Sequence, residues 1–228
     1  MDLTEKSRRV PEKILLGPGP TPVEGRILRA MAEPTLGHLD RDFVAIMDET
    51  RDLLRMVFQT GNDLTVAMSG TGSAGMETAC VNMIERGDKA IICSHGVFGS
   101  RMQDVAGRCG AEVVEVNAPM GRPIDPGDVE RAVKANPDAK FLGIVHAETS
   151  TGVLQPLDEI ANLAHMAGMF MIVDAVTSLG GMEVPVDRLG LDMVYSGSQK
   201  CLGCPPGLAP VTVGPRAVEH IKGRKTKV

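Results

Sequence analysis

Aromatic side chains are scarce in this sequence of 228 residues, which has five Phe, one Tyr and no Trp. Proteins that bind single-stranded nucleic acids commonly stack bases on such rings, so that kind of binding surface is missing. Clustered basic residues are also rare, since the formal net charge is −5 and the one dense basic run lies at residues 222–227. Because a nucleic-acid backbone attracts clustered Lys and Arg, we expect no nucleic-acid partner.

Long hydrophobic runs are absent as well. The longest uninterrupted apolar stretch, residues 166–173, has eight residues, whereas a membrane-spanning helix needs about 18. The first six residues, Met-Asp-Leu-Thr-Glu-Lys, carry charges and lack the apolar segment of a secretion signal. We therefore expect no membrane contact and a cytoplasmic location, with a peroxisomal location left open.

Cysteines number five, and their odd count and scattered positions do not indicate a disulfide framework. Cys201 and Cys204 have C-x-x-C spacing, but no second pair follows at the spacing of a zinc site. Pro205 and Pro206 stand where a redox motif would begin a helix. We expect free thiols in a reducing compartment and no metal site.

The hydrophobic pattern alternates short β-rich runs with longer amphipathic ones. Seven runs have strand character: residues 64–68, 90–93, 112–116, 141–146, 169–174, 193–195 and 208–213. Helical patterns occupy residues 23–32, 43–58, 74–86, 98–109, 126–135 and 156–167. This alternation predicts an α/β fold with a mostly parallel seven-stranded sheet flanked by helices. We expect an N-terminal arm at residues 1–22 and one domain at residues 23–228, with ligands at the carboxyl ends of the strands.

Residues 69–75, Ser-Gly-Thr-Gly-Ser-Ala-Gly, connect the first predicted strand to a helix. In such a turn, backbone N–H groups and the positive end of the helix bind phosphate. A nicotinamide-binding Rossmann domain would need an acid at the end of the second strand, but that strand ends Cys93-Ser94-His95. A P-loop would need a following Gly-Lys-Ser/Thr, which is also missing. The turn therefore suits one phosphate monoester, unless its glycines serve close packing alone.

Two other predicted strands lead to ionisable residues. Asp174 closes an unbroken apolar strand, where a buried carboxylate is costly without a partner. Lys200 lies in a loop of small residues after the strand at 193–195. Taken alone, Asp174 could be a turn or helix-capping residue, and Lys200 could be a solvated surface amine. Together with the phosphate turn they match the needs of pyridoxal phosphate, which uses a lysine as imine partner, an acid facing its ring nitrogen and a phosphate cup.

Several motifs in collinear order strengthen this interpretation. They are Gly-Pro-Gly-Pro at 17–20, Ser-Gly-Thr-Gly-Ser at 69–73, His-Gly-Val-Phe-Gly at 95–99, His-Ala-Glu-Thr-Ser-Thr-Gly at 146–152, Val-Asp-Ala-Val-Thr-Ser-Leu-Gly-Gly at 173–181 and Tyr-Ser-Gly-Ser-Gln-Lys-Cys-Leu at 195–202. With them the chain resembles the class V aminotransferases, above all the alanine–glyoxylate and serine–glyoxylate (serine–pyruvate) group. The resemblance covers nearly the whole chain and implies the large domain of the fold type I pyridoxal phosphate enzymes.

The resemblance also implies roles for particular residues. Lys200 would form the imine with the cofactor, and Asp174 would face the ring nitrogen. Eight further positions match residues around the cofactor or substrate: Thr71, Gly72 and Gln199 at the phosphate, Phe98, Val176 and Thr149 at the ring, Ser73 as a further cofactor contact, and Gly37 beside the substrate. Ser73 stands where mammalian alanine–glyoxylate enzymes have His. Gln199 stands where the cysteine desulfurase branch usually has His, which argues against desulfuration.

The implied activity is transamination between a small amino acid, alanine or serine, and a small 2-oxo acid, glyoxylate or pyruvate. Lys200 would move the proton from the substrate Cα to the cofactor. A ureidoglycine-type aminotransferase or a class V lyase is the main alternative, and a nicotinamide-binding protein or a non-catalytic binding module is a weaker one. The resemblance further implies a two-fold homodimer and a small C-terminal domain beyond Val228, which would supply the arginine for the substrate carboxylate.

Overall fold

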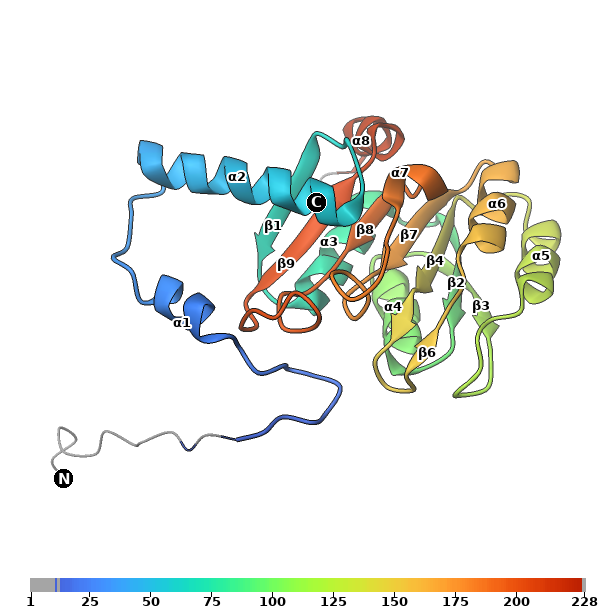
Figure 1. Ribbon diagram of the computed structural model, residues 1–228. Helices are drawn as coiled ribbons and strands as arrows, with labels where there is room; N and C mark the ends of the chain where they lie inside the picture. The colour runs from blue at the N-terminus through green and yellow to red at the C-terminus, as the bar shows by residue number, and fades with distance from the viewer. Residues whose placement is uncertain (1–10, 12, 227–228) are drawn as a thin grey trace, which may run out of the picture.

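A seven-stranded sheet forms the centre of the molecule (Figure 1), seen in a computed structural model that describes residue 11 and residues 13–226. From one edge to the other the strands are β1 (Leu64–Ser69), β9 (Leu208–Val213), β8 (Met193–Tyr195), β7 (Phe170–Asp174), β4 (Phe141–Val145), β2 (Lys89–Ser94) and β3 (Glu112–Asn117). These are the seven strands predicted from the sequence. A two-stranded hairpin of β5 (Ala147–Glu148) and β6 (Val153–Leu154) was not predicted.

The sheet is parallel except at β9. Strands β3, β2, β4, β7 and β8 pair in parallel, whereas β9 lies antiparallel to both β8 and β1. The chain passes from β8 to β9 through residues 196–207, which contain no helix. A parallel return usually runs through a helix that crosses one face of the sheet, and the lack of a helix here is consistent with the change of direction. Lys200 lies in that connection.

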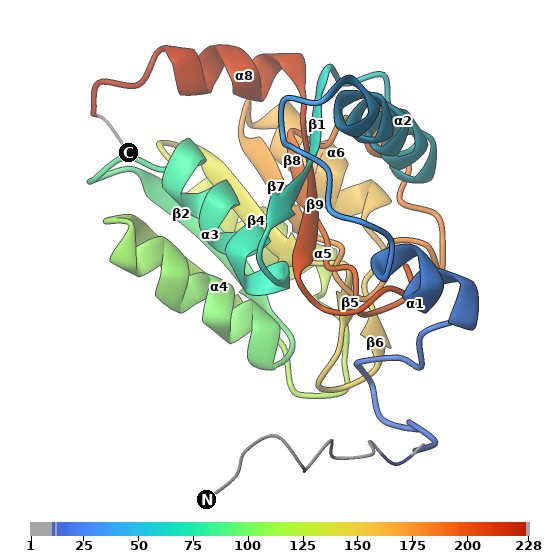
Figure 2. The same cartoon turned by 90° about the vertical axis from the view of Figure 1, so that its left-hand side faces the viewer.

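Helices cover both faces of the sheet (Figure 2). One face packs against α2 (Arg41–Phe58), α5 (Pro126–Ala135), α6 (Asp158–Met166) and α7 (Val186–Leu189). The other packs against α3 (Gly72–Met83), α4 (Val97–Arg108) and α8 (Pro215–Lys222). Each face has its own core, built mainly of aliphatic and Met side chains, with Phe58 on one face and Phe141 and Tyr195 on the other. The short α7 and α8 are additions to the predicted set.

The side chains of the N-cap residues cap α1, α2 and α5, whereas the N-cap residues of the other helices in the described chain make no such bond. The side chain of Asp40 accepts a hydrogen bond from the N–H of Asp42 at the start of α2. At α5, Asp125 accepts from Gly127, and Pro126 occupies the first helical position. At α3, in contrast, the N-cap residue Thr71 makes no side-chain capping bond. The N–H groups at that helix end therefore remain available to a ligand.

The N-terminal segment is only loosely attached to the sheet. Residues 1–10 and 12 of the predicted arm lie outside the described residues, and α1 (Gly25–Met31) buries none of its residues. Residues 18–21 nevertheless contact the connection after β8, where the N–H of Thr21 donates to the carbonyl of Gln199 at 3.1 Å. None of the helices in the described part of the chain has the length and apolar character needed to cross a membrane.

Candidate functional site

A cavity of about 320 Å³ opens at the carboxyl ends of the parallel strands. Its wall comes from the start of α3, the first half of α4, the ends of β4 and β7, and the connection between β8 and β9. Nine of the ten predicted site residues line it: Thr71, Gly72, Ser73, Phe98, Thr149, Asp174, Val176, Gln199 and Lys200. The tenth, Gly37, is exposed between α1 and α2 and is not among the lining residues, so its role stays a prediction.

Lys200 is buried in this wall, with 9% of its surface exposed. Its Nζ donates a hydrogen bond to the carbonyl oxygen of Pro18 at 2.6 Å. Desolvation lowers the pKa of the ammonium group, and the nearby Cys201 and Asp174 oppose that shift. Lowering the pKa favours the neutral amine, which is the form that attacks a carbonyl carbon.

Gly19 makes room for the lysine. Its φ of +136° lies in a region that residues with a side chain rarely adopt, and a Cβ there would come within 2.6 Å of Nζ of Lys200. The Gly-Pro-Gly-Pro run therefore brings backbone against the lysine at a point where any side chain would displace it.

Asp174 lies at the end of β7 and is 3% exposed. Its two carboxylate oxygens accept hydrogen bonds from the N–H of Val176 and from the hydroxyl of Tyr195, both at 2.9 Å. Desolvation raises the pKa of the Asp174 carboxyl to about 6, and Glu148 adds to that rise, while the two hydrogen bonds and Lys200 oppose it. Tyr195 was not predicted as part of the site, because only the pairing of β7 with β8 brings it beside Asp174.

The opposite end of the cavity is suited to an anion. Gly72 begins α3, and a Cβ there would lie 2.7 Å from Cγ2 of Val176, so glycine permits the close approach of helix and loop. The side-chain oxygen of Gln199 is buried there without a hydrogen-bond partner among the described residues. The uncapped helical N–H groups can donate to a bound phosphate ester, and the Gln199 amide can do so once it is turned so that its NH2 group, instead of its oxygen, faces the anion.

Phe98 and Val176 lie on the wall between these two ends, and Thr149 faces the same space. The hydroxyls of Thr149 and Thr177 are 2.5 Å apart, which links the loop after β5 to the loop after β7. A flat ring can thus lie between an aromatic and an aliphatic side chain, with a hydroxyl group at its edge.

Glu148 is a buried residue that the sequence analysis did not single out. It is 1% exposed, and its carboxylate accepts hydrogen bonds from the N–H groups of Phe98, Gly99 and Ser150 at 3.1–3.3 Å. Gly96 is required beside it, since a Cβ at Gly96 would lie 2.3 Å from Cγ of Glu148. The carboxylate therefore caps the start of α4 and fixes the backbone that carries Phe98.

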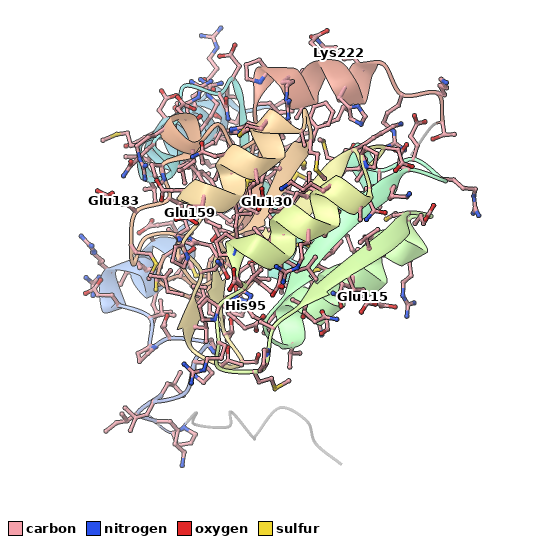
Figure 3. All side chains as sticks on the ribbon, turned by 90° about the vertical axis from the view of Figure 1, so that its right-hand side faces the viewer. His95, Glu115, Glu130, Glu159, Glu183 and Lys222 are labelled. Carbon is pink, nitrogen blue, oxygen red and sulfur yellow. The ribbon has the colours of Figure 1, made fainter. Side chains whose placement is uncertain are left out.

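The end of the second strand lacks the acidic residue that a Rossmann-type dinucleotide site would need there. Strand β2 ends at Ser94, and the next residue is the buried His95 (Figure 3). Within the described part of the chain, neither ring nitrogen of His95 has a hydrogen-bond partner. Nor do three or more His, Cys, Asp or Glu side chains come together as a metal site there.

Comparison with known proteins decides the family, since the family model for aminotransferase class-V matches residues 26–225. This chain belongs to the class V aminotransferases. The class V chain is 42% identical over 219 residues to an alanine–glyoxylate aminotransferase of Drosophila melanogaster, covering 96% of this chain and 55% of that protein. It is 39% identical over 215 residues to an (S)-ureidoglycine–glyoxylate transaminase of Bacillus subtilis, covering 94% of this chain and 51% of the relative.

Solved structures give the same answer for the class V chain. The crystal structure of an alanine–glyoxylate aminotransferase from Nostoc superposes with a TM-score of 0.96 at 45% identity, covering 99% of this chain and 60% of that one. A ureidoglycine–glyoxylate aminotransferase from Bacillus subtilis superposes with a TM-score of 0.94 at 37% identity, covering 97% and 57%. The chain thus spans about half the length of the curated relatives it matches.

Proposed function

We propose that this protein is a pyridoxal-phosphate-dependent aminotransferase that transfers the amino group of alanine or serine to glyoxylate or pyruvate. The observation that carries the proposal is the convergence of Lys200, Asp174 and the uncapped start of α3 on one cavity. The names of the relatives from Drosophila and Nostoc support glyoxylate as the acceptor.

The residues present fit the cofactor at each of its functional groups. The start of α3 and Gln199 would hold the phosphate, Phe98 and Val176 would lie on the two faces of the ring, and Asp174 would pair with the ring nitrogen. When bound, pyridoxal phosphate supplies an electron sink for the electron pair left as the substrate Cα–H bond breaks.

The chain's own residues supply the proton chemistry. As a neutral amine, Lys200 can accept a proton at Nζ and return it, and the contact with the carbonyl of Pro18 holds the side chain in place. Asp174 is ionised at neutral pH because its pKa of about 6 lies below that range. Tyr195 and the N–H of Val176 fix the carboxylate, so its negative charge is presented in one direction without reorganisation.

A ureidoglycine–glyoxylate transaminase is the second candidate, because the Bacillus subtilis relatives of that name match the chain almost as well. The two candidates share every residue argued above and differ in the amino donor. Initial rates with alanine, serine and (S)-ureidoglycine at fixed glyoxylate separate them.

We also propose that the protein is a two-fold homodimer whose interface includes α2. Six large apolar side chains of this helix are exposed: Val44, Ile46, Met47, Leu53, Met56 and Val57. Its N-terminal half extends beyond the sheet (Figure 1). A second copy of the same chain can cover exposed apolar side chains of this kind in an isologous interface, and their concentration on one helix favours such an interface.

Borohydride trapping tests the proposed cofactor site on the full protein. Reduction in the presence of pyridoxal phosphate should fix the label on Lys200, as found by peptide mapping, and amino acid substrates should remove it when added before reduction. Lys200→Ala should abolish labelling, while Lys140→Ala, which removes an exposed lysine outside the cavity wall, should not. Label on another lysine, or no label, would overturn the proposal.

A further inference from the structure

Ser73, which stands where mammalian alanine–glyoxylate enzymes have His, has a side-chain partner in this structure. It is the second residue of α3, half-buried, and it lines the cavity beside Thr71 and Gly72. The Oγ atom accepts a hydrogen bond from Nη1 of Arg101 at 3.0 Å. Since α3 and α4 lie side by side (Figure 2), the contact joins two helices that both border the cavity.

The guanidinium of Arg101 contacts both Ser73 and Phe98, and no carboxylate among the described residues neutralises its charge. Its guanidinium lies 5.4 Å from the centre of the Phe98 ring, within the range of a cation–π contact. Within residues 13–226, no carboxylate oxygen comes within 4.0 Å of it, whereas Arg108 on the same helix pairs with Asp104 at 2.8 Å. Arg101 and Lys200 are the two cationic side chains in the cavity wall.

The direction of the hydrogen bond determines what Ser73 can do. A guanidinium can only donate, so Oγ is the acceptor and the hydroxyl proton stays free to donate elsewhere. A donor whose oxygen already accepts from a cation is polarised and forms a stronger hydrogen bond to an anion. A phosphate monoester, with a charge of roughly −1.5 to −2 at pH 7, is the ligand such a donor favours.

We propose that Arg101 is a positioning residue for the cofactor phosphate, acting through Ser73. The guanidinium holds Oγ so that the hydroxyl donates to the phosphate, and its stacking on Phe98 fixes the guanidinium in turn. This inference rests on the proposed function, because it takes pyridoxal phosphate as the ligand. In this proposal, a Ser–Arg pair from two helices occupies the place where mammalian relatives carry a single His.

Calorimetric titration of the full protein with pyridoxamine 5′-phosphate and with pyridoxamine isolates the phosphate, because neither amine forms an imine with Lys200. Arg101→Gln should weaken binding of the phosphate ester about tenfold and leave binding of pyridoxamine unchanged. Ser73→Ala should do the same, and the double variant should lose no more than the single ones, because the two residues act as one unit. Arg101→Lys, which keeps the charge without the planar fork, should fall in between.

Arg108→Gln is the matched control, since it removes the same charge from the same helix and should change neither affinity. Equal weakening of both ligands by Arg101→Gln would overturn the inference, because it would show a general effect on the cavity. Additive losses in the double variant would overturn it as well. A wild-type protein that binds neither ligand would refute the proposed function itself, whereas binding that is indifferent to Arg101 refutes the positioning role alone.

Discussion

At the scale of single residues, Asp174 is a carboxylate enclosed by protein, and its negative charge can be removed by a single substitution. We predict that Asp174→Asn still binds pyridoxal phosphate but slows removal of the substrate Cα proton by about a hundredfold or more, since the ring nitrogen loses its counter-charge. Single-turnover absorbance with alanine measures the rate. Asp158→Asn, the same change at an exposed site paired with Arg188, should leave the rate unaltered.

The same carboxylate makes stability depend on pH. Burial raises the pKa of Asp174 from 3.8 to about 6 in the folded protein without cofactor. Between these values the folded chain keeps a proton that the unfolded chain has released, so the free energy of unfolding falls as the pH rises. We predict a loss of about 3 kcal/mol at most from about pH 4 to pH 6, read as the difference between wild type and Asp174→Asn in urea unfolding. Parallel pH profiles for the two proteins would contradict this.

At the scale of elements, the start of α4 depends on Glu148. Replacing Glu148 by Ala leaves three N–H groups without their acceptor, of which the one on Gly99 is buried, and we predict a loss of about 2–4 kcal/mol in the free energy of unfolding. Glu130→Ala, at an exposed residue of α5 (Figure 3), should cost less than about 0.5 kcal/mol. Glu148→Gln should in addition lower the pKa of Asp174, because the charge on Glu148 contributes to raising it.

The contact between the N-terminal segment and the connection after β8 gives a second test at this scale. We predict that Gly19→Ala reduces labelling of Lys200 about tenfold, because the new Cβ would overlap Nζ and the backbone at φ +136° would be strained. Gly17→Ala in the same segment is the control, since a Cβ there meets nothing within 4 Å. Borohydride labelling of both variants under one set of conditions measures the effect.

Elements with a strong local pattern could be predicted, and those that depend on distant contacts could not. The apolar strand ending at Asp174 and the turn at residues 69–75 are continuous in sequence, and both lie where the pattern indicated. The hairpin β5–β6 has two residues in each strand, too few to show periodicity. Strand pairing and helix packing bring three further residues to the site: Tyr195, Glu148 and Arg101. Such contacts between distant residues cannot be predicted from the spacing of residues along the sequence.

At the scale of the whole molecule, the exposed apolar face of α2 makes assembly testable. Replacing Ile46, which is 51% exposed, by Glu should shift the protein from dimer to monomer in sedimentation velocity at micromolar concentration, because it places a charge in the proposed interface. Met166→Glu, at a residue of α6 that is 88% exposed, should leave the dimer intact. A wild-type protein that sediments as a monomer would contradict the proposed interface.

The position of the antiparallel strand β9 also determines when the sheet can finish forming during synthesis. It lies between β8 and β1 and is the last of the seven strands to leave the ribosome. Until β9 is synthesised, β1 has no partner in the sheet, so β1 stays unpaired while residues 70–207 are made, and β8 has an open edge while residues 196–207 are made. Contacts this distant in sequence slow folding and prolong exposure to aggregation. The lysine-bearing connection thus becomes ordered only when β9 closes the sheet, and we expect binding of the proposed cofactor to report that closure.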